Sequence, residues 1–342
     1  MPGILAIQIK RIGDAVLTAA ALASLRARHP DARIVLMLSE ACGDMGALFP
    51  MVDVVLTWRS RRLNLRLLGT IGKGGWDAVL DFSGTDRSAM LALLSRAPLR
   101  AGYGRFATNK LRLKAWTSLC KASVRDLPTV DFHHELVRTL WPDAPTVPDA
   151  GHLKLPEGLS IPRLPQGYVL LHPGTARAEK YWPADHWAAL LKMLGAKAVP
   201  AVMTGGTGAE ELAHLAAIRA AGGVFADLSG KLTLQQLAGV IAGAAGSVTV
   251  DTGAMHLASA FKVPQVALFG PTNPWHWAPR HETALILHGS TWCRGIPGTE
   301  TSLVPNHRTL LPKAPREEMG NISPEAVMAA LAGVMKKAGR IL

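Results

Sequence analysis

The sequence predicts an α/β protein with two doubly wound domains that face a cleft, each built on a parallel sheet covered by helices. Three observations favour this fold class. Short apolar runs of strand length alternate with segments of helical period. The alternation stops at a proline-rich stretch and then restarts. Several apolar runs also end in polar turns that contain glycine, which are typical of the carboxyl ends of strands in such sheets.

The first half of the chain alternates between the two kinds of segment. We expect strands at residues 4–9, 32–38, 52–56 and 78–82, and helices at 15–28 and 42–49. Lys10 and Arg11 precede an apolar stretch, as in a secretory signal. However, a strand-like run comes before these charges and Asp14 lies at the junction, so we interpret this region as strand, loop and helix.

Residues 142–165 contain six prolines and little periodicity, which predicts a linker. Beyond it we expect strands at 168–172, 198–204, near Phe225, and at 248–250 and 266–269, with helices at 183–194, 210–221 and 233–242 and after Asp251. Residues 289–315 show no period and are expected to be loop. The last helix, 324–337, begins behind Ser323 as its N-cap. The expected domains are therefore 1–150 and 151–322, with a terminal segment, 323–342, whose helix packs back on the first domain.

Composition narrows the class of protein. The 342 residues are 49% hydrophobic and 18% charged, which indicates a well-filled globular core. Three cysteines (Cys42, Cys120 and Cys293) lie far apart without metal-like spacing, which predicts a reduced, cytoplasmic protein without disulfides or structural zinc. The net charge of +12 calls for a polyanionic partner. Because the basic residues lack an aromatic-interleaved motif, a nucleic acid is the least favoured partner.

Residues 248–271 carry the most information. An apolar run ends in Asp251-Thr252-Gly253, a helical pattern follows, and a second apolar run closes the unit. This order places backbone N–H groups and the positive end of a helix dipole at residues 252–255, which suits a phosphate or diphosphate. Asp251 could cap the helix, and Gly253 would allow close backbone approach. A purely structural strand–helix turn is the alternative.

Two further glycine-containing loops follow strands of the same domain. In the first, Gly174 and Thr175 could donate to a phosphate and Lys180 could neutralise it. The second, residues 204–208, fits neither the P-loop nor the dinucleotide fingerprint. Each alone could be an ordinary surface loop, but three polar loops at corresponding strand ends favour a nucleotide.

In the first domain, Asp14 follows the first strand and could be a general base or a helix N-cap. His133 and His134 are adjacent on an expected helix and point in different directions, so a solvated surface is favoured over a metal site. No paired-aspartate motif, nucleophile elbow or catalytic cysteine context is present in the sequence.

Together these pieces resemble glycosyltransferase family 9, the lipopolysaccharide core heptosyltransferases. The matching segments, in the family's order, are residues 4–18, 172–175 with 180–183, 227–234, 250–257, 269–274 and 322–327. The resemblance implies a GT-B fold and metal-independent, inverting transfer of heptose from ADP-heptose to a lipopolysaccharide inner-core acceptor, without a cofactor. It also implies a role in outer-membrane biogenesis, as a cytoplasmic enzyme peripheral to the inner membrane.

The resemblance assigns roles residue by residue. Asp14 matches the catalytic aspartate, with Arg11 and Gly13 beside it on the acceptor side. Lys180 and Thr175, next to Gly174, match phosphate-contacting positions, and Leu232 lies where the family's chain passes the adenine. The donor-binding loop corresponds to Asp251, Thr252, Gly253, Ala254, Met255 and His256. The family's acidic ribose contact has no clear match in residues 205–210, where Thr207 and the displaced Glu210 are candidates. Residues 288–315 lack the cysteine-bearing tail common in relatives.

Nine basic residues and no acidic one lie between Arg87 and Arg125. Within this stretch we expect Arg100, Arg105, Lys110 and Arg112 to hold the acceptor or an anionic membrane surface, the alternative being a solvated basic face. Other functions left open are a GT-B transferase with another nucleotide-sugar, a non-catalytic nucleotide-binding protein and a nucleotide-sugar epimerase.

Overall fold

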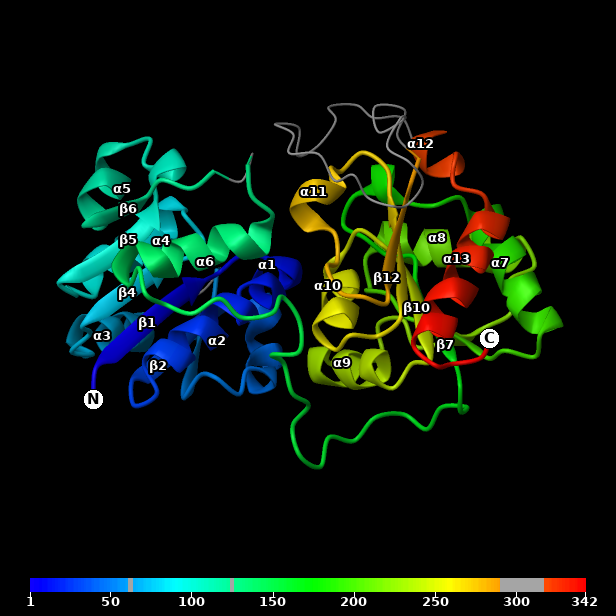
Figure 1. Cartoon of the computed structure of the whole chain (residues 1–342), viewed down its shortest axis with the longest axis horizontal. Helices are drawn as coiled ribbons and strands as arrows, with labels where there is room; N and C mark the ends of the chain where they lie inside the picture. Colours follow the sequence, from blue (N-terminus) through cyan, green and yellow to red (C-terminus); the bar gives the residue numbers. More distant parts are fainter. Residues whose placement is uncertain (61–63, 124–125, 290–316) are drawn as a thin grey trace. The chain divides into compact units, whose positions relative to one another are not determined.

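The computed structural model describes residues 1–60, 64–123, 126–289 and 317–342 (Figure 1). It divides into two compact units, Met1–Pro156 and Glu157–Leu342. Each unit contains one six-stranded sheet, covered by helices, in which every strand pair is parallel. The predicted α/β class is confirmed. The expected loop at 289–315 lies, apart from Gly289, outside the described residues.

The first sheet has the strand order β3-β2-β1-β4-β5-β6. Its strands are β1 (Gly3–Gln8), β2 (Arg33–Ser39), β3 (Val54–Trp58), β4 (Ala78–Asp81), β5 (Leu99–Tyr103) and β6 (Ser118–Cys120). Every residue of β1 is buried, because helices cover both faces of a parallel sheet. The order reverses between β1 and β4, and ligands of such sheets bind where the loops after these two strands diverge.

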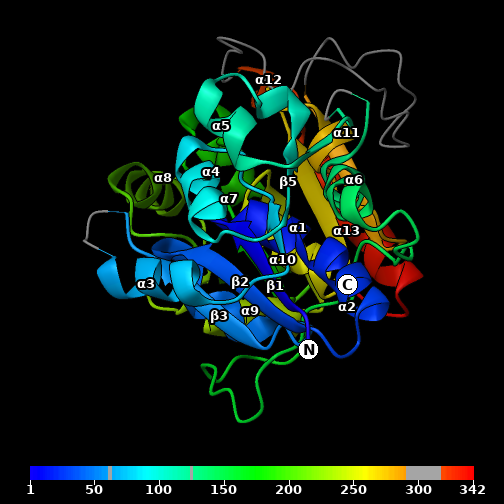
Figure 2. The same cartoon turned by 90° about the vertical axis from the view of Figure 1, so that its left-hand side faces the viewer.

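The helices of the first unit are α1 (Ile12–Leu17), α2 (Ala19–Arg28), the 3₁₀ segments η1 (Glu40–Leu48) and η2 (Gly104–Phe106), α3 (Leu65–Lys73), α4 (Asp86–Leu94), α5 (Lys110–Ala115) and α6 (Thr129–Leu140). Figure 2 shows α3 and α4 on one face of the sheet and α2 and α6 on the other. The helix expected at 15–28 is divided at Thr18. The hydroxyl of Thr18 donates to the carbonyl of Asp14 and accepts from the amide of Gln8, at 2.8 and 3.0 Å.

The second sheet repeats the same topology, with the order β12-β11-β10-β7-β8-β9. Its strands are β7 (Val169–His172), β8 (Ala201–Met203), β9 (Ala226–Asp227), β10 (Gly246–Val250), β11 (Gln265–Phe269) and β12 (Ala284–His288). Its helices are η3 (Ala178–Lys180), α7 (Ala184–Ala196), α8 (Ala209–Ala220), α9 (Leu234–Ala242), α10 (Gly253–Ala260), α11 (Pro274–Trp277), α12 (Glu317–Gly320) and α13 (Pro324–Lys337). Here the reversal lies between β7 and β10, so the loops after these strands mark the expected ligand position.

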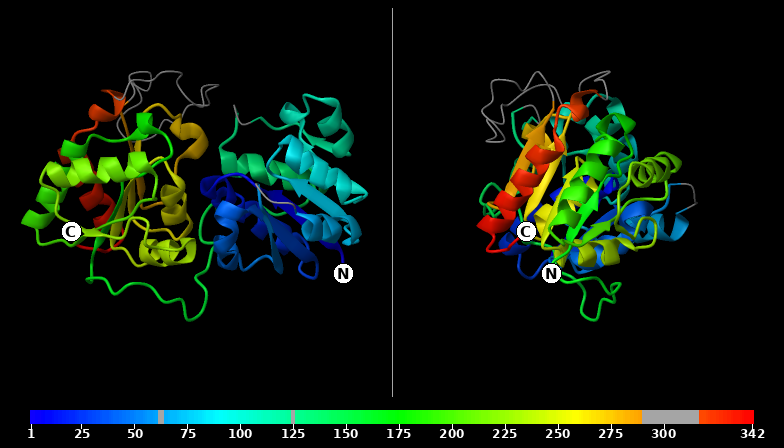
Figure 3. Two further views of the ribbon diagram at one scale, coloured as in Figure 1. Left: turned by 180° about the vertical axis from the view of Figure 1, so that it is seen from behind. Right: turned by 90° about the vertical axis from the view of Figure 1, so that its right-hand side faces the viewer.

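The terminal helix α13 differs from the expectation that it packs on the first domain. Its apolar residues Val327, Leu331, Val334 and Met335 are buried in the core of the second unit, and the helix contacts α7 and strands β10–β12 (Figure 3). The reason is the three-to-four-residue spacing of these side chains, which gives one apolar side that covers its own unit's sheet. The predicted N-cap is confirmed, since the hydroxyl of Ser323 accepts from the backbone N–H of Ala326.

Within the parts of the chain that the structure describes, no helix combines the length and apolar character needed to cross a bilayer.

Candidate active site

The polar loops predicted in the second unit lie side by side. Strands β7 and β10 pair in parallel, with His172 opposite Thr249, so the loops that follow them leave the same edge of the sheet. The loop after β7 contains Gly174 and Thr175, and the loop after β10 contains residues 251–253. Because this is the point where the strand order reverses, these five sequence-predicted loop residues lie where an α/β sheet binds ligands.

A buried ion pair joins these two loops. The ammonium Nζ of Lys180 lies 2.6 Å from Oδ2 of Asp251 and 3.4 Å from the backbone oxygen of the same residue. The side chains are only 13% and 8% exposed. Burial by itself would raise the pKa of Asp251, but the neighbouring Lys180 charge, helped by His256 and Thr272, holds it below the usual value. Lys180 is therefore fixed at the edge of the sheet, 71 residues from its partner in sequence.

The suggestion that Asp251 caps the following helix is wrong. The N-cap of α10 is Thr252, whose side chain makes no capping hydrogen bond to the described residues. The carboxylate of Asp251 pairs with Lys180 instead, because a buried carboxylate is stabilised more by a cation than by one amide. The first-turn amides of α10 therefore receive no capping hydrogen bond from the side chain of Thr252.

The side chains that follow in α10 mostly pack inward. Ala254, Met255 and His256 are buried, and Met255 belongs to an apolar cluster with Phe269 and Ile286. Of this sequence-predicted loop, Thr252 and Gly253 are the half-buried members. A ligand at this end of α10 would therefore meet backbone amides rather than the side chains of 254 and 255.

The loop after β7 is held by its neighbours. Nδ1 of His172 lies 2.8 Å from the hydroxyl of Thr204, at the end of the adjacent strand, and burial lowers the pKa of this imidazole to about 4. The buried Thr175 accepts a hydrogen bond on its carbonyl from the hydroxyl of Tyr181 at 3.1 Å. Neutral, hydrogen-bonded groups thus fix the loop that carries Gly174.

Sequence reasoning missed Glu211. A Cβ built on Gly174 would lie 2.3 Å from Oε1 of Glu211, and one built on Gly206 would lie 2.4 Å from Oε2. The carboxylate therefore lies between the two glycine loops, a position open to it only because both residues lack side chains. Glu210, the predicted candidate, is exposed. Adjacent glutamates in the first turn of a helix differ by about 100° in direction, and the sequence alone does not say which one faces the loops.

The remaining predicted donor positions lie around the loop after β8. The backbone N–H of Gly230 donates to the carbonyl of Gly205 at 2.9 Å. Gly230 has a positive φ of 68°, and a Cβ there would lie 2.6 Å from Cγ2 of Thr207. The half-buried Leu232 lies two residues after Gly230. Thr207 and Leu232 are therefore brought to neighbouring loops of the second unit.

In the first unit, Asp14 lies in the first turn of α1. The N-cap of this helix is Arg11, so the N-cap interpretation of Asp14 is wrong. Asp14 is half-buried, and within the described residues no hydrogen bond or ion pair reaches its carboxyl group. Gly13 precedes it in the same turn, and Arg11 is exposed. The loop also meets the end of β4, since Ser83 accepts on its hydroxyl from the N–H of Ile9 at 2.8 Å.

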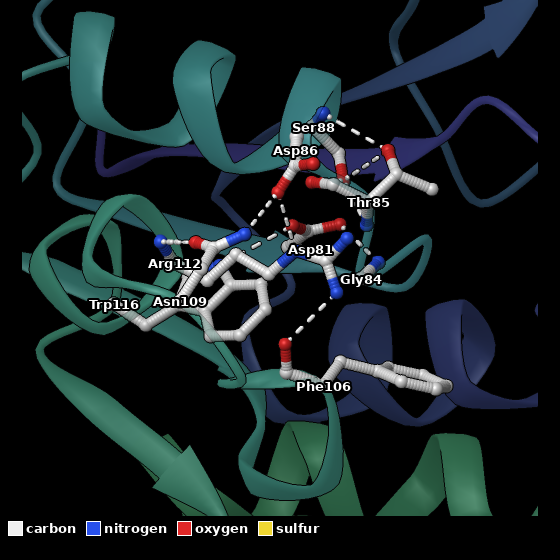
Figure 4. Close-up of polar contacts among 9 residues, drawn as sticks. All are labelled: Asp81, Gly84, Thr85, Asp86, Ser88, Phe106, Asn109, Arg112 and Trp116. Carbon is white, nitrogen blue, oxygen red and sulfur yellow. Dashed lines mark hydrogen bonds and ion pairs between the residues drawn. The ribbon is translucent and has the colours of Figure 1, made fainter.

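A second carboxyl group, which sequence reasoning did not find, lies at this edge. Asp81 ends β4 and is fully buried. It accepts hydrogen bonds from the N–H groups of Ser83 and Gly84 at 3.0 and 2.9 Å and from the indole of Trp116 at 3.2 Å. Figure 4 shows Gly84 and Trp116 beside its carboxyl group. Burial nevertheless raises its pKa to about 6. Because the carboxyl group of Asp81 is buried and already accepts from three N–H donors, it is suited to hold the loop in place rather than to bind a ligand.

The expectation that His133 and His134 lie on a solvated surface is wrong. Both are buried, at 3% exposure. Nδ1 of His133 lies 2.6 Å from the hydroxyl of Tyr103, and burial lowers the pKa of His133 to about 3. The side of α6 that faces the core is wide enough to include two successive residues, which the sequence pattern did not reveal.

The four basic residues expected to bind an acceptor or membrane are not equivalent. Arg100 donates to the carbonyls of Ala97 and Ala115, and Arg112 forms an ion pair with Asp86 at 2.7 Å. Both guanidinium groups thus hold the fold itself. Arg105 and Lys110 are exposed, the former with its guanidinium 5.1 Å from the centre of the Phe106 ring.

The described residues contain no group of three or more His, Cys, Asp or Glu side chains placed to hold a metal ion.

Comparison with known proteins decides the family. A sequence model described as glycosyltransferase family 9 (heptosyltransferase) matches residues 64–302. The chain belongs to glycosyltransferase family 9. It is 28% identical to lipopolysaccharide heptosyltransferase 1 of Pseudomonas aeruginosa over 292 residues, which cover 79% of each chain.

Solved structures of this family share the fold. The structure of E. coli ADP-heptose lipopolysaccharide heptosyltransferase II matches with a TM-score of 0.78 and 21% identity, over 99% of this chain and 100% of that one. E. coli heptosyltransferase WaaC with ADP-2-deoxy-2-fluoro heptose matches with a TM-score of 0.71 and 19% identity, over 96% and 98%. The family 9 chain thus has the GT-B fold and is a glycosyltransferase of the lipopolysaccharide heptosyltransferase type.

Proposed function

We propose that this family 9 enzyme transfers heptose from ADP-heptose to a lipopolysaccharide inner-core acceptor, with inversion and without a metal ion. The observation that carries the proposal is the Lys180–Asp251 pair at the edge of the second sheet. It holds a cation beside the uncapped end of α10 and next to the glycine loop after β7. Such an arrangement suits a diphosphate.

The second unit is proposed to bind the donor. Departure of ADP develops negative charge on the diphosphate, and Lys180 with the amides of Thr252 and Gly253 would stabilise that charge electrostatically. Thr175 and Gly174 border the same position. Glu211, between two glycine loops, is the candidate for a ribose hydroxyl, since a carboxylate accepts two hydrogen bonds from a diol.

The first unit is proposed to supply the base. The carboxyl group of Asp14 has no hydrogen-bond partner among the described residues, so its lone pairs remain available for an acceptor hydroxyl. Removal of that proton as the oxygen attacks the sugar contributes roughly 10²–10⁴-fold to the rate. Attack on the face opposite the departing ADP gives inversion. Arg11 and Gly13 would border the acceptor.

Because the proposed acceptor is a lipopolysaccharide precursor, we propose that the enzyme acts at the cytoplasmic face of the inner membrane. Lipopolysaccharide precursors carry phosphates and acidic sugars, and the net charge of +12 favours such partners. Of the basic residues expected to help, Arg105 and Lys110 are exposed, whereas Arg100 and Arg112 are engaged in the fold.

Asp14→Asn tests the proposed base. We expect turnover to fall about a hundredfold or more, because the amide cannot take the proton, while ADP affinity stays unchanged. The matched control is Asp31→Asn, an exposed aspartate of the same unit, which should leave turnover unaltered. Retention of more than about a tenth of wild-type turnover in Asp14→Asn would remove the general-base role.

The donor is tested by thermal-shift measurements with ADP-, UDP- and GDP-sugars. A ligand that binds only the folded state raises the melting temperature by mass action. We expect stabilisation by ADP-heptose and ADP alone. Stabilisation by UDP- or GDP-sugars would indicate another donor, and binding without sugar transfer would indicate a non-catalytic protein.

A further inference from the structure

Gln8 is a buried polar residue at the end of an otherwise apolar strand. It is the last residue of β1 and is 0% exposed, and the five residues before it, Gly3–Ile7, carry no polar side chain. A buried amide costs free energy unless its donors and acceptors are satisfied, and an apolar side chain would pack in this position at a lower cost. The partners of Gln8 therefore indicate what its side chain contributes.

The amide group of Gln8 reaches the end of α1. Its Nε2 donates to the hydroxyl of the fully buried Thr18 at 3.0 Å and lies 3.5 Å from the carbonyl oxygen of Asp14. The hydroxyl of Thr18 donates to that same carbonyl at 2.8 Å. A hydroxyl that donates to the carbonyl four residues earlier tends to bend a helix, and the chain divides into α1 and α2 at Thr18. Gln8 and Thr18 thus fasten the backbone of Asp14 to the end of β1.

The other end of the same amide group meets the loop after β4. Oε1 of Gln8 lies 3.4 Å from the hydroxyl of Ser83, and the backbone N–H of Ser83 donates to the carboxyl group of Asp81 at 3.0 Å. Ser83 and Asp81 are both buried. A chain of buried polar groups therefore runs from the end of β4, through the end of β1, to the backbone of Asp14.

Few other contacts among the described residues fix the position of Asp14. Only Ala15 and Val16 of α1 are buried, so the apolar anchor of this helix is small. Within the described residues no hydrogen bond or ion pair reaches the carboxyl group of Asp14. This carboxyl group is therefore placed through its backbone. A catalytic group must be held within about 0.5 Å of its productive position, so the fastening of α1 bears directly on the proposed reaction.

We propose that Gln8 and Thr18 are positioning residues, which hold α1 so that the carboxyl group of Asp14 is aligned with the acceptor hydroxyl. This inference rests on the proposed function, because it takes Asp14 to be the base. Gln8 and Thr18 act through the backbone of Asp14 and touch neither substrate. Their removal should therefore lower kcat and leave the binding of the donor unchanged.

The test uses the full chain with Gln8→Met and Thr18→Val, which remove the hydrogen bonds and change side-chain volume little. Thr18→Ser restores the hydroxyl. The matched control is Thr139→Val, because the hydroxyl of Thr139 donates to the carbonyl of Glu135 at 2.8 Å, the same four-residue bond in α6 of the same unit. The measurements are kcat, the KM for the donor, ADP affinity, and hydrogen exchange of the α1 amides by mass spectrometry. Circular dichroism checks that each variant is folded at the assay temperature.

We expect Gln8→Met and Thr18→Val to lower kcat at least about tenfold, with donor KM and ADP affinity within about twofold of wild type. The α1 amides should exchange at least about fivefold faster in both variants. Thr18→Ser should keep kcat within about threefold of wild type, and Thr139→Val should alter neither kcat nor exchange in α1. An undiminished kcat in Thr18→Val, an equal loss in Thr18→Ser, or an equal loss in Thr139→Val would overturn the proposal.

Asp14→Asn separates this inference from the proposed function. If Thr18 acts through Asp14, adding Thr18→Val to Asp14→Asn should change the residual turnover by less than about twofold, and a further tenfold loss would contradict the positioning role. If Asp14→Asn loses turnover while Gln8→Met and Thr18→Val keep it, only the positioning role fails. Hydrogen exchange requires no turnover. If the wild type transfers no heptose but both variants speed exchange in α1 as expected, the proposed function fails and the fastening of α1 by Gln8 and Thr18 is supported.

Discussion

Removal of the ammonium in Lys180→Met leaves the carboxylate of Asp251 buried without its counter-ion. The Nζ–Oδ2 distance is 2.6 Å and the two side chains are 13% and 8% exposed, so solvent screens the pair little. Loss of one partner from a buried pair costs about 3–5 kcal/mol, because the remaining charge keeps its desolvation penalty. We expect the unfolding free energy of the second unit at pH 7 to fall by that amount.

The dependence of the unfolding free energy on pH provides a specific test of this prediction. In the wild type the pKa of Asp251 is held below 3.8, so the pair contributes stability above the unfolded pKa and loses it as pH falls through the folded pKa. In Lys180→Met the effect of burial prevails and raises the pKa of Asp251. The variant therefore loses stability as pH rises through that raised pKa, and its deficit relative to wild type should grow from about pH 4 to about pH 7.

Urea unfolding followed by circular dichroism measures both effects. The control is Arg219→Met, which breaks the Arg219–Asp227 pair of the same unit, whose side chains are 48% and 26% exposed. An exposed pair contributes under about 1 kcal/mol. Lys180→Met with Asp251→Asn should recover much of the loss, because no charge is then buried alone. A deficit of Lys180→Met below about 1 kcal/mol, or one that does not grow with pH, would refute the reasoning.

Three further outcomes are expected. Lys180→Met should weaken ADP binding about ten- to a hundredfold by calorimetry, through loss of a charge-assisted contact; unchanged affinity would remove Lys180 from the donor site. Glu211→Gln should weaken ADP binding about tenfold and Glu210→Gln should not; equal effects would contradict the assignment drawn from the glycine contacts. His133 has its pKa lowered from 6.5 to about 3 by burial, so the wild type loses stability as pH falls from 6.5 towards 3, at about 1.4 kcal/mol per pH unit at most. His133→Phe should reduce this loss of unfolding free energy at low pH, as measured by urea unfolding at several pH values. An unchanged slope of the unfolding free energy against pH would show that His133 is not its source.

Much of the first unit between residues 65 and 140 was not predicted. Helix α4 and strand β5 have weak sequence patterns. The capping box of α4 uses Ser88 where the usual pattern has glutamate or glutamine, and β5 contains Arg100 and Gly102. Their places are set by packing. A Cβ on Gly102 would lie 2.1 Å from the Trp116 ring, so glycine is required there by a contact that no local pattern reveals.

The sequence by itself determined that strands and helices alternate in each of two units, that a linker joins these units, and in which order the glycine loops occur. These properties depend on residues close together in the chain, where periodicity and turn chemistry act directly. It also placed Asp14 and Asp251 at strand ends and Lys180 close to the glycine-containing turn that follows a strand. Their roles in transfer stay predictions.

Only the tertiary structure decided which groups meet. It paired Lys180 with Asp251 across 71 residues, turned Glu211 rather than Glu210 to the loops, buried His133 and packed α13 on its own sheet. Each outcome depends on strand order and on the direction of a side chain around a helix. Both are fixed by the burial of apolar surface between segments far apart in sequence, which no local pattern encodes.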